Sequence, residues 1–206
     1  GGATLGAIKL TADLLYSTIA ANYSRMMTLP GEVDTAHGHM RMEGLSGRFG
    51  VAGLLRAGNL AIEPFSQFEV TQLKMPAYAE TAYTNTGQIG SLNLAFQAKT
   101  YTAKRSFVGS SFTDEVALSP STRLVGLLKG SWVHDFNPER SVYTGFASAP
   151  EYSFETFGAA GPKDAAHLDL GAALRGKSYE LRVNVGSTLA ARYSNLSAEA
   201  GIRFVW

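Results

Sequence analysis

Leu196-Ser-Ala-Glu-Ala-Gly-Ile-Arg-Phe-Val-Trp206, the last stretch of the chain, decides the fold. Every second residue in it is apolar, namely Ala198, Ala200, Ile202, Phe204 and Trp206. This period of two predicts a β-strand with one apolar face and one mostly polar face. A soluble domain gains little by ending on an exposed tryptophan, whereas the last strand of an outer-membrane barrel ends at an aromatic girdle. We therefore expect this segment to be the closing strand of a transmembrane barrel.

The composition excludes several classes of protein and leaves others open. The 206 residues include 18 basic and 17 acidic ones without a basic cluster, which gives no reason to expect nucleic acid as a partner. The absence of cysteine excludes disulfide scaffolds, cysteine-based zinc sites and thiol catalysis. The sequence contains no run of 18 apolar residues, so it predicts no transmembrane helix. Low charge, 22 glycines and 11% aromatic residues suit a lipid-facing β protein and a soluble β-sandwich equally.

Alternation recurs along the chain in segments separated by turn residues, which is the weak signature of a membrane barrel. The clearest case is residues 179–189, which follow a predicted turn at 176–178 and a similar segment around 168–174. Pro64 should mark a bulge or break in its own strand. We expect ten or eleven strands, the others lying at about 5–11, 15–26, 39–56, 60–71, 91–98, 106–116, 123–136 and 141–154.

Alternation alone does not separate a barrel from a soluble sandwich, because both have one apolar and one polar face. Two features favour the barrel. The apolar faces carry large side chains up to Trp206, and the segments 123–136 and 141–154 exceed the usual five or six residues of a strand. The predicted fold class is thus all-β, an antiparallel transmembrane β-barrel.

Several segments occur in the order seen in a known family. They are Leu60-Ala-Ile-Glu-Pro-Phe-Ser-Gln-Phe68, Ala82-Tyr-Thr-Asn-Thr-Gly87, Leu118-Ser-Pro-Ser-Thr-Arg-Leu124, Gly130-Ser-Trp-Val-His-Asp-Phe136 and Phe146-Ala-Ser-Ala-Pro-Glu-Tyr-Ser-Phe-Glu-Thr-Phe-Gly158. Each segment is weak by itself. Together, over about residues 38–206, they resemble the β-domain of autotransporters, the translocator unit of type V secretion in Gram-negative bacteria.

This resemblance implies a barrel of about twelve strands in the outer membrane, which anchors and exports an N-terminal passenger. It also implies a linker helix in the lumen, outer-membrane lipid and the barrel-insertion machinery as partners, a monomer, and neither enzymatic activity nor a cofactor. The machinery would recognise the closing strand with Phe204 and Trp206. We expect residues 1–206 to be one translocator domain whose first strand and linker helix lie upstream of Gly1.

The residues themselves suggest two further groups. Trp132, Phe136 and Tyr179 are expected in an interface belt. The polar faces should line the lumen and pair with one another, with water or with the linker helix, either as a hydrophilic channel or only as structural partners. These lumen residues are Glu63, Gln67, Glu69, Asp169, Arg175, Glu180, Arg182, Glu199 and Arg203.

No catalytic or metal site emerges from the sequence. His134 and Asp135 are adjacent on a strand and should face opposite sides, which argues against a catalytic pair. His37 and His39 lack a nearby third ligand. There is no Gly-x-Ser-x-Gly elbow and no phosphate-binding loop. A stand-alone small porin or adhesin-type barrel and a soluble β-sandwich binding domain remain as alternatives.

Overall fold

The structure, a computed structural model, describes residues 1–29, 32–82, 92–158, 160–191 and 193–204. Trp206 therefore lies outside the described residues, and with it one part of the predicted closing strand. Within the described ranges every regular element is a β-strand. No helix in these ranges is long and apolar enough to cross a membrane.

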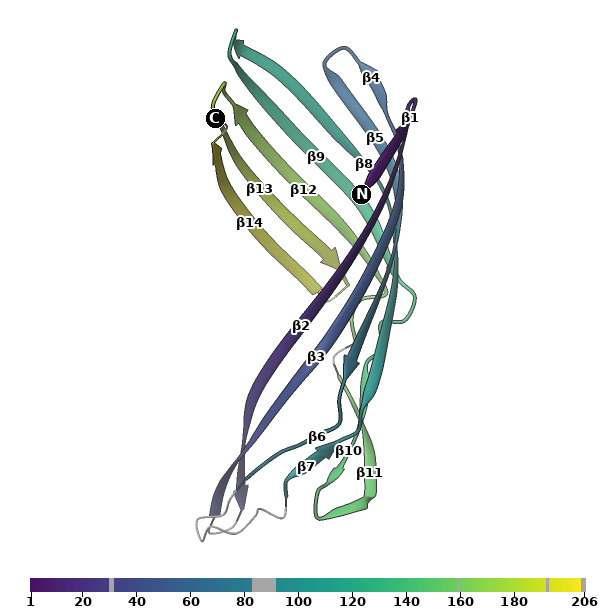
Figure 1. Ribbon diagram of the computed structural model, residues 1–206, viewed down its shortest axis with the longest axis vertical. Coiled ribbons are helices and arrows are strands. Elements are labelled where there is room, and N and C mark those ends of the chain that lie inside the picture. Colours follow the sequence, from purple (N-terminus) through teal and green to yellow (C-terminus); the bar gives the residue numbers. More distant parts are fainter. Residues whose placement is uncertain (30–31, 83–91, 159, 192, 205–206) are drawn as a thin grey trace.

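One large antiparallel sheet dominates the molecule (Figure 1). Each of its main strands pairs with the next one along the chain, so the strands form a simple meander. In sheet order they are β1 (Gly2–Leu5), β2 (Ile8–Leu29), β3 (Glu32–Gly53), β5 (Leu60–Met75), β8 (Lys99–Ser119), β9 (Thr122–Asp135), β12 (Asp164–Arg175), β13 (Tyr179–Ala190) and β14 (Tyr193–Phe204), and β4 (Leu55–Ala57) pairs with β5 beside β3.

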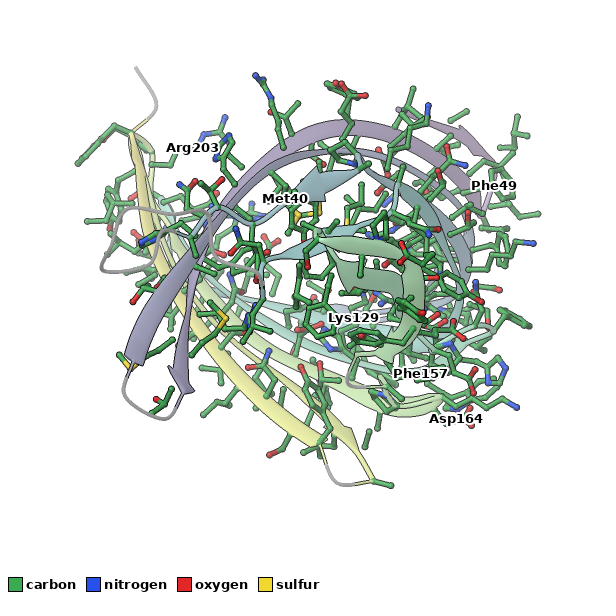
Figure 2. All side chains as sticks on the ribbon, turned by 90° about the horizontal axis from the view of Figure 1, so that it is seen from below. Met40, Phe49, Lys129, Phe157, Asp164 and Arg203 are labelled. Atoms are coloured by element: carbon green, nitrogen blue, oxygen red, sulfur yellow. The ribbon has the colours of Figure 1, made fainter. Side chains whose placement is uncertain are left out.

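The sheet curls into a partial barrel (Figure 2). Among the described residues, β14 pairs only with β13, and β2 pairs only with β1 and β3. The curl is therefore open along β2 on one side and along β14 on the other. The predicted fold class, an all-β antiparallel barrel, is confirmed.

The two ends of the curl differ. At one end the connections are short turns at residues 6–7, 58–59, 120–121 and 176–178. Gly6 and Gly58 have φ angles of 61° and 63°, which glycine adopts without steric cost. At the other end β5 leads to β8, and β9 leads to β12, through long connections. These contain β6 (Tyr78–Ala79), β7 (Leu94–Phe96), β10 (Ser141–Phe146) and β11 (Ala149–Phe157).

The four strands of the long connections form a second sheet with the order β11-β10-β7-β6. The pairing of β7 with β10 joins the two long connections to each other. The views along and across the curl agree that this small sheet lies at the long-connection end, within the outline of the curled wall (Figures 1 and 2).

The register of the large sheet separates its side chains into two faces. Phe49 lies opposite Phe68, Leu170 lies opposite Leu128 and Val185, and Leu181 lies opposite Ile202. These residues define the convex face, and Figure 2 shows Phe49 pointing outward from the curl. Lys129 and Met40 point inward in the same view and define the concave face. The convex face is exposed and apolar, with Val183 53% and Ile202 67% exposed.

Several predicted strand boundaries are wrong. Residues 5–11 and 15–26 are not two strands. The chain turns at Gly6, and β2 then runs unbroken for 22 residues. Residues 141–154 are not one strand either, because the chain turns between β10 and β11, which pair with each other in the small sheet.

The break predicted at Pro64 lies on the neighbouring strand instead. β5 continues through Pro64, which pairs in register with Ser110 of β8. Opposite Pro64, however, β3 ends at Gly53 and β4 begins at Leu55. Proline has no backbone N–H to donate, so the ladder is interrupted where a neighbour would need that donor.

Candidate functional site

The concave face is the candidate functional surface. The register places all nine polar residues predicted to line a lumen on this one face. They are Glu63, Gln67, Glu69, Asp169, Arg175, Glu180, Arg182, Glu199 and Arg203. The period of two explains this result, since a one-residue shift on any strand would move its whole set to the other face.

Ion pairs between strands organise much of this face. Arg48 on β3 pairs with Glu69 on β5 at 2.5 Å. Arg175 pairs with Glu180 at 3.3 Å, and Arg182 pairs with Glu199 at 3.2 Å. Further pairs link Lys9 with Glu63, Glu115 with Arg123 and Asp135 with Arg105.

These pairs stabilise the wall only modestly. The side chains of Arg182 and Glu199 are 55% and 64% exposed, so water screens their attraction. An exposed pair contributes about 0–1 kcal/mol. The concave face is therefore a hydrated, charge-balanced surface rather than a packed core.

Not every predicted lumen residue has a charged partner. Arg203 lies opposite Glu180 in the register but forms no ion pair within the described part of the chain. Asp169 lies 3.2 Å from His167. Lys129, which the sequence reasoning missed, lies 4.8 Å above the ring centre of Phe65. This contact crosses from β9 to β5, and no local sequence pattern indicates it.

Aromatic residues border the convex face at both ends. At the long-connection end, the ring centres of Phe136 and Phe68 are 6.1 Å apart, and His134 lies between Trp132 and Phe136. At the short-turn end, Tyr179 lies opposite Phe204. Trp132 and Phe136 thus lie at one end of the convex face and Tyr179 at the other, and their role in an interface belt stays a prediction.

The length of the convex apolar face of β13 suits a bilayer. Ten residues separate Tyr179 from Leu189 on β13, which corresponds to about 33 Å of strand. At a tilt of about 40° this strand length spans about 25 Å, the height of the apolar band of an outer-membrane barrel.

The closing strand places its apolar residues on the convex face. Ala198, Ala200, Ile202 and Phe204 lie opposite the apolar residues of β13, and Ile202 and Phe204 are each 67% exposed. Recognition of this strand by insertion machinery is a matter for experiment and stays a prediction.

A buried ion pair ties one long connection to the curled wall. Arg25 of β2 donates to both carboxylate oxygens of Glu80, at 3.1 and 2.5 Å, and to the backbone oxygen of Leu92 at 3.0 Å. The Glu80 side chain is 1% exposed and also accepts a hydrogen bond from the Leu94 amide. Burial by itself would raise the pKa of Glu80, but the hydrogen bonds from Arg25 and Leu94 more than offset burial and lower this pKa.

His134 and Asp135 do not form a catalytic pair with each other, because they lie on opposite faces of β9. His134 on the convex face lies 2.7 Å from Asp164, whereas Asp135 on the concave face lies 3.2 Å from Arg105. The two residues face opposite sides, as predicted from the strand period. Among the residues that the structure describes, no group of three histidine, aspartate or glutamate side chains could hold a metal ion.

The wall is antiparallel and open, its convex face is apolar with aromatic borders, and its concave face is polar. These features together define the class of outer-membrane β-barrels. The profile of the family "Autotransporter beta-domain" matches residues 1–186, and the chain belongs to this family. No curated protein matches the chain. The match includes the first 37 residues, which precede the segments that carry the resemblance, and ends before β14.

Family membership places the chain in the bacterial outer membrane as a translocator domain of type V secretion. It also implies a surrounding lipid bilayer and a passenger domain.

Proposed function

We propose that this chain anchors an N-terminal passenger in the outer membrane and exports it to the cell surface through the space enclosed by the concave face. The observation that carries the proposal is the hydrated surface of exposed ion pairs, such as Arg182 with Glu199, behind an apolar convex wall. A passenger crossing in an extended form needs a polar path, because bilayer lipid satisfies none of its backbone groups.

A closed wall requires further strands. Unpaired strand edges inside a bilayer are very costly, and both β2 and β14 have an open edge among the described residues. We propose that residues 1–206 are one translocator domain, and that strands and a linker helix N-terminal to Gly1 complete a barrel of about twelve strands. The linker helix would lie against the polar residues of the concave face.

The two ends assign an orientation. Outer-membrane barrels have short periplasmic turns and longer extracellular loops. The short-turn end, where β14 finishes at Phe204, would therefore face the periplasm, and the small sheet would lie outside. In this orientation the closing strand presents its end to barrel-insertion machinery on the periplasmic side. The barrel would act as a monomer and as a transport module without catalytic activity.

The test is surface exposure of the passenger in the full-length protein. Protease added to intact cells should remove the passenger while the barrel stays protected in the membrane. A matched variant with a short stable domain inserted next to the passenger should stall and leave the passenger inaccessible. A barrel that assembles correctly but never exposes an N-terminal domain would contradict export and favour a stand-alone small porin.

A further inference from the structure

Three neighbouring strands carry a basic residue at the same distance beyond the apolar band. On the convex face, the apolar residues of β3, β5 and β8 end at Leu45, Val70 and Val108 towards the long connections. Four residues further along each strand come Arg41, Lys74 and Lys104. An offset of four returns to the same face, so the three cations form one convex-face group, here named the basic patch.

The three cations form a slanted row. Lys74 pairs in register with Glu43 on β3 and with Thr100 on β8, so the cation shifts by two residues from β3 to β5 and by four residues from β5 to β8. The Cα atoms of Arg41 and Lys74 are therefore about 8 Å apart, and those of Lys74 and Lys104 about 14 Å. Because the strands are tilted by about 40°, the slant of the rows compensates for part of these shifts, and the heights of the three Cα atoms span about 9 Å.

Each cation lies beyond the last apolar residue of its strand, near the lipid headgroups. Four residues correspond to about 13 Å of strand, or about 10 Å above the edge of the hydrocarbon at this tilt. The headgroup layer is about 5–8 Å thick on each side of the bilayer, and lysine and arginine side chains extend towards it.

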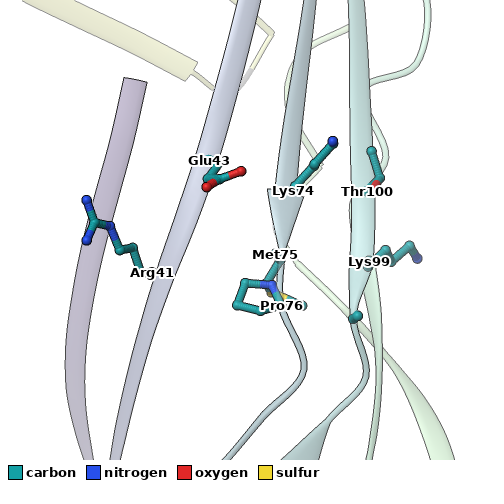
Figure 3. Close-up of a pocket in the computed structure, with 8 residues that line it drawn as sticks. Arg41, Glu43, Lys74, Met75, Pro76, Lys99 and Thr100 are labelled. Atoms are coloured by element: carbon teal, nitrogen blue, oxygen red, sulfur yellow. The ribbon is translucent and has the colours of Figure 1, made fainter. Parts of the chain in front are cut away.

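The basic side chains are free to bind an anion. Arg41, Lys74 and Lys104 are exposed and form no ion pair with any described residue. Arg41 and Lys74 line a pocket of about 440 Å³ together with Glu43 (Figure 3). Lys99 lies in the same pocket, but it donates to Ser141 and is already engaged. With Glu43 included, the patch keeps a net positive charge.

The opposite end of the same strands has no counterpart. At the short-turn end, the convex positions of β4, β5 and β8 are Leu55, Ala57, Leu60, Asp114 and Val116. Described convex positions there carry no lysine or arginine. The positive charge is thus specific to the end that the proposed orientation places outside.

We propose that Arg41, Lys74 and Lys104 bind the phosphate groups of anionic lipid in the outer leaflet and fix the barrel to that leaflet. The inference rests on the orientation proposed above. Charge complementarity and the position of the cations beyond the apolar residues of their strands commit the patch to a phosphorylated lipid headgroup rather than to free phosphate, because the cations border a lipid-facing apolar surface.

The experiment measures binding of detergent-purified full-length protein to nanodiscs that contain diphosphorylated lipid A, with dephosphorylated lipid A as the comparison. The triple variant Arg41→Gln, Lys74→Gln and Lys104→Gln should weaken binding to the phosphorylated lipid at least tenfold. Each basic residue near an anionic surface contributes about fivefold to binding. Binding to the dephosphorylated lipid should not change.

The matched control neutralises Arg56, Lys163 and Lys177, which removes the same charge elsewhere, and should retain the affinity of the parent protein. Equal weakening by both triple variants, or no weakening by the patch variant, would overturn the inference. Competition by millimolar inorganic phosphate would also overturn it, since it would indicate a free-phosphate site. Membrane extraction of each variant is checked first: a barrel that never inserts contradicts the proposed function, whereas an inserted barrel with unchanged lipid binding contradicts only this inference.

Discussion

Val183 and Asn184 are adjacent on β13 and face opposite sides of the wall, so an arginine at each position measures what each side contacts. Val183 is convex and 53% exposed, opposite Ala200 of β14. It lies four residues beyond Tyr179, which corresponds to about 13 Å of strand and a depth of about 10 Å in a band about 25 Å tall. Asn184 is concave and lies opposite Glu199.

Val183→Arg should lower the free energy of unfolding by about 2–4 kcal/mol, the cost of arginine near the bilayer midplane. Asn184→Arg should change it by less than about 1 kcal/mol, because the new cation is hydrated and lies near Glu199. Urea unfolding of the full-length protein in lipid vesicles measures both effects. With an m value of about 2–3 kcal/mol/M, the first variant should shift the midpoint down by about 1 M. Equal shifts for the two variants, or a larger shift for Asn184→Arg, would refute the assignment of the faces.

Three other predictions test the ion pairs and the closing strand. Glu80→Gln should speed hydrogen exchange at the Leu94 amide about 10- to 100-fold relative to Glu151→Gln, because Arg25 loses its buried partner, which costs about 1–3 kcal/mol. Because the folded pKa of Glu80 is lowered, its stabilisation is present above the ordinary value of 4.5 and is lost as the pH falls through the folded value, so the parent protein should approach the variant only in acid. Arg48→Gln should change single-channel conductance in planar bilayers if the concave face lines an open channel, whereas unchanged conductance with lower thermal stability would favour a purely structural role for the pair with Glu69. Phe204→Ala should reduce outer-membrane assembly several-fold, as measured by heat-modifiable gel mobility, more than Leu196→Ala does, although both side chains are exposed on the same strand. Equal losses of assembly for the two variants would mean that Phe204 is an ordinary lipid-contacting residue.

Most of what the sequence could predict came from the alternation of apolar and polar residues along each strand. It assigned Glu180 and Arg182 to one face of β13, and Leu181 and Val183 to the other, because adjacent residues of a strand must point in opposite directions. The same rule separated His134 from Asp135. Such inferences need no knowledge of which strands are neighbours.

This alternation does not predict contacts between segments that are distant in the sequence. The pair of Arg25 with Glu80 joins residues 55 positions apart, and Glu80 lies in a connection without periodicity. The small sheet forms because β7 and β10 come from two different connections, which no local pattern indicates. Pro64 acted on a neighbouring strand for a similar reason, since a missing donor affects the partner of the ladder as well as its own strand.

Recognising the basic patch requires both the alternation of faces along each strand and the pairing of distant strands. Arg41, Lys74 and Lys104 belong to no motif in the sequence and lie 30 or more positions apart along the chain. Only the register of β3, β5 and β8 shows that they lie on one face of neighbouring strands. The proposed lipid-binding group is therefore defined by position within the sheet rather than by a linear motif.

The most direct test of the account is a single-cysteine scan along β13, since this chain has no cysteine of its own. Cysteine is introduced in turn at positions 180 to 185 of the full-length protein, and intact outer membranes are treated with a small water-soluble thiol reagent. The account predicts labelling at positions 180, 182 and 184, which face the concave side, and protection at 181, 183 and 185, which face lipid. Uniform labelling, or labelling of the odd positions alone, would contradict a translocator barrel with its polar face inside.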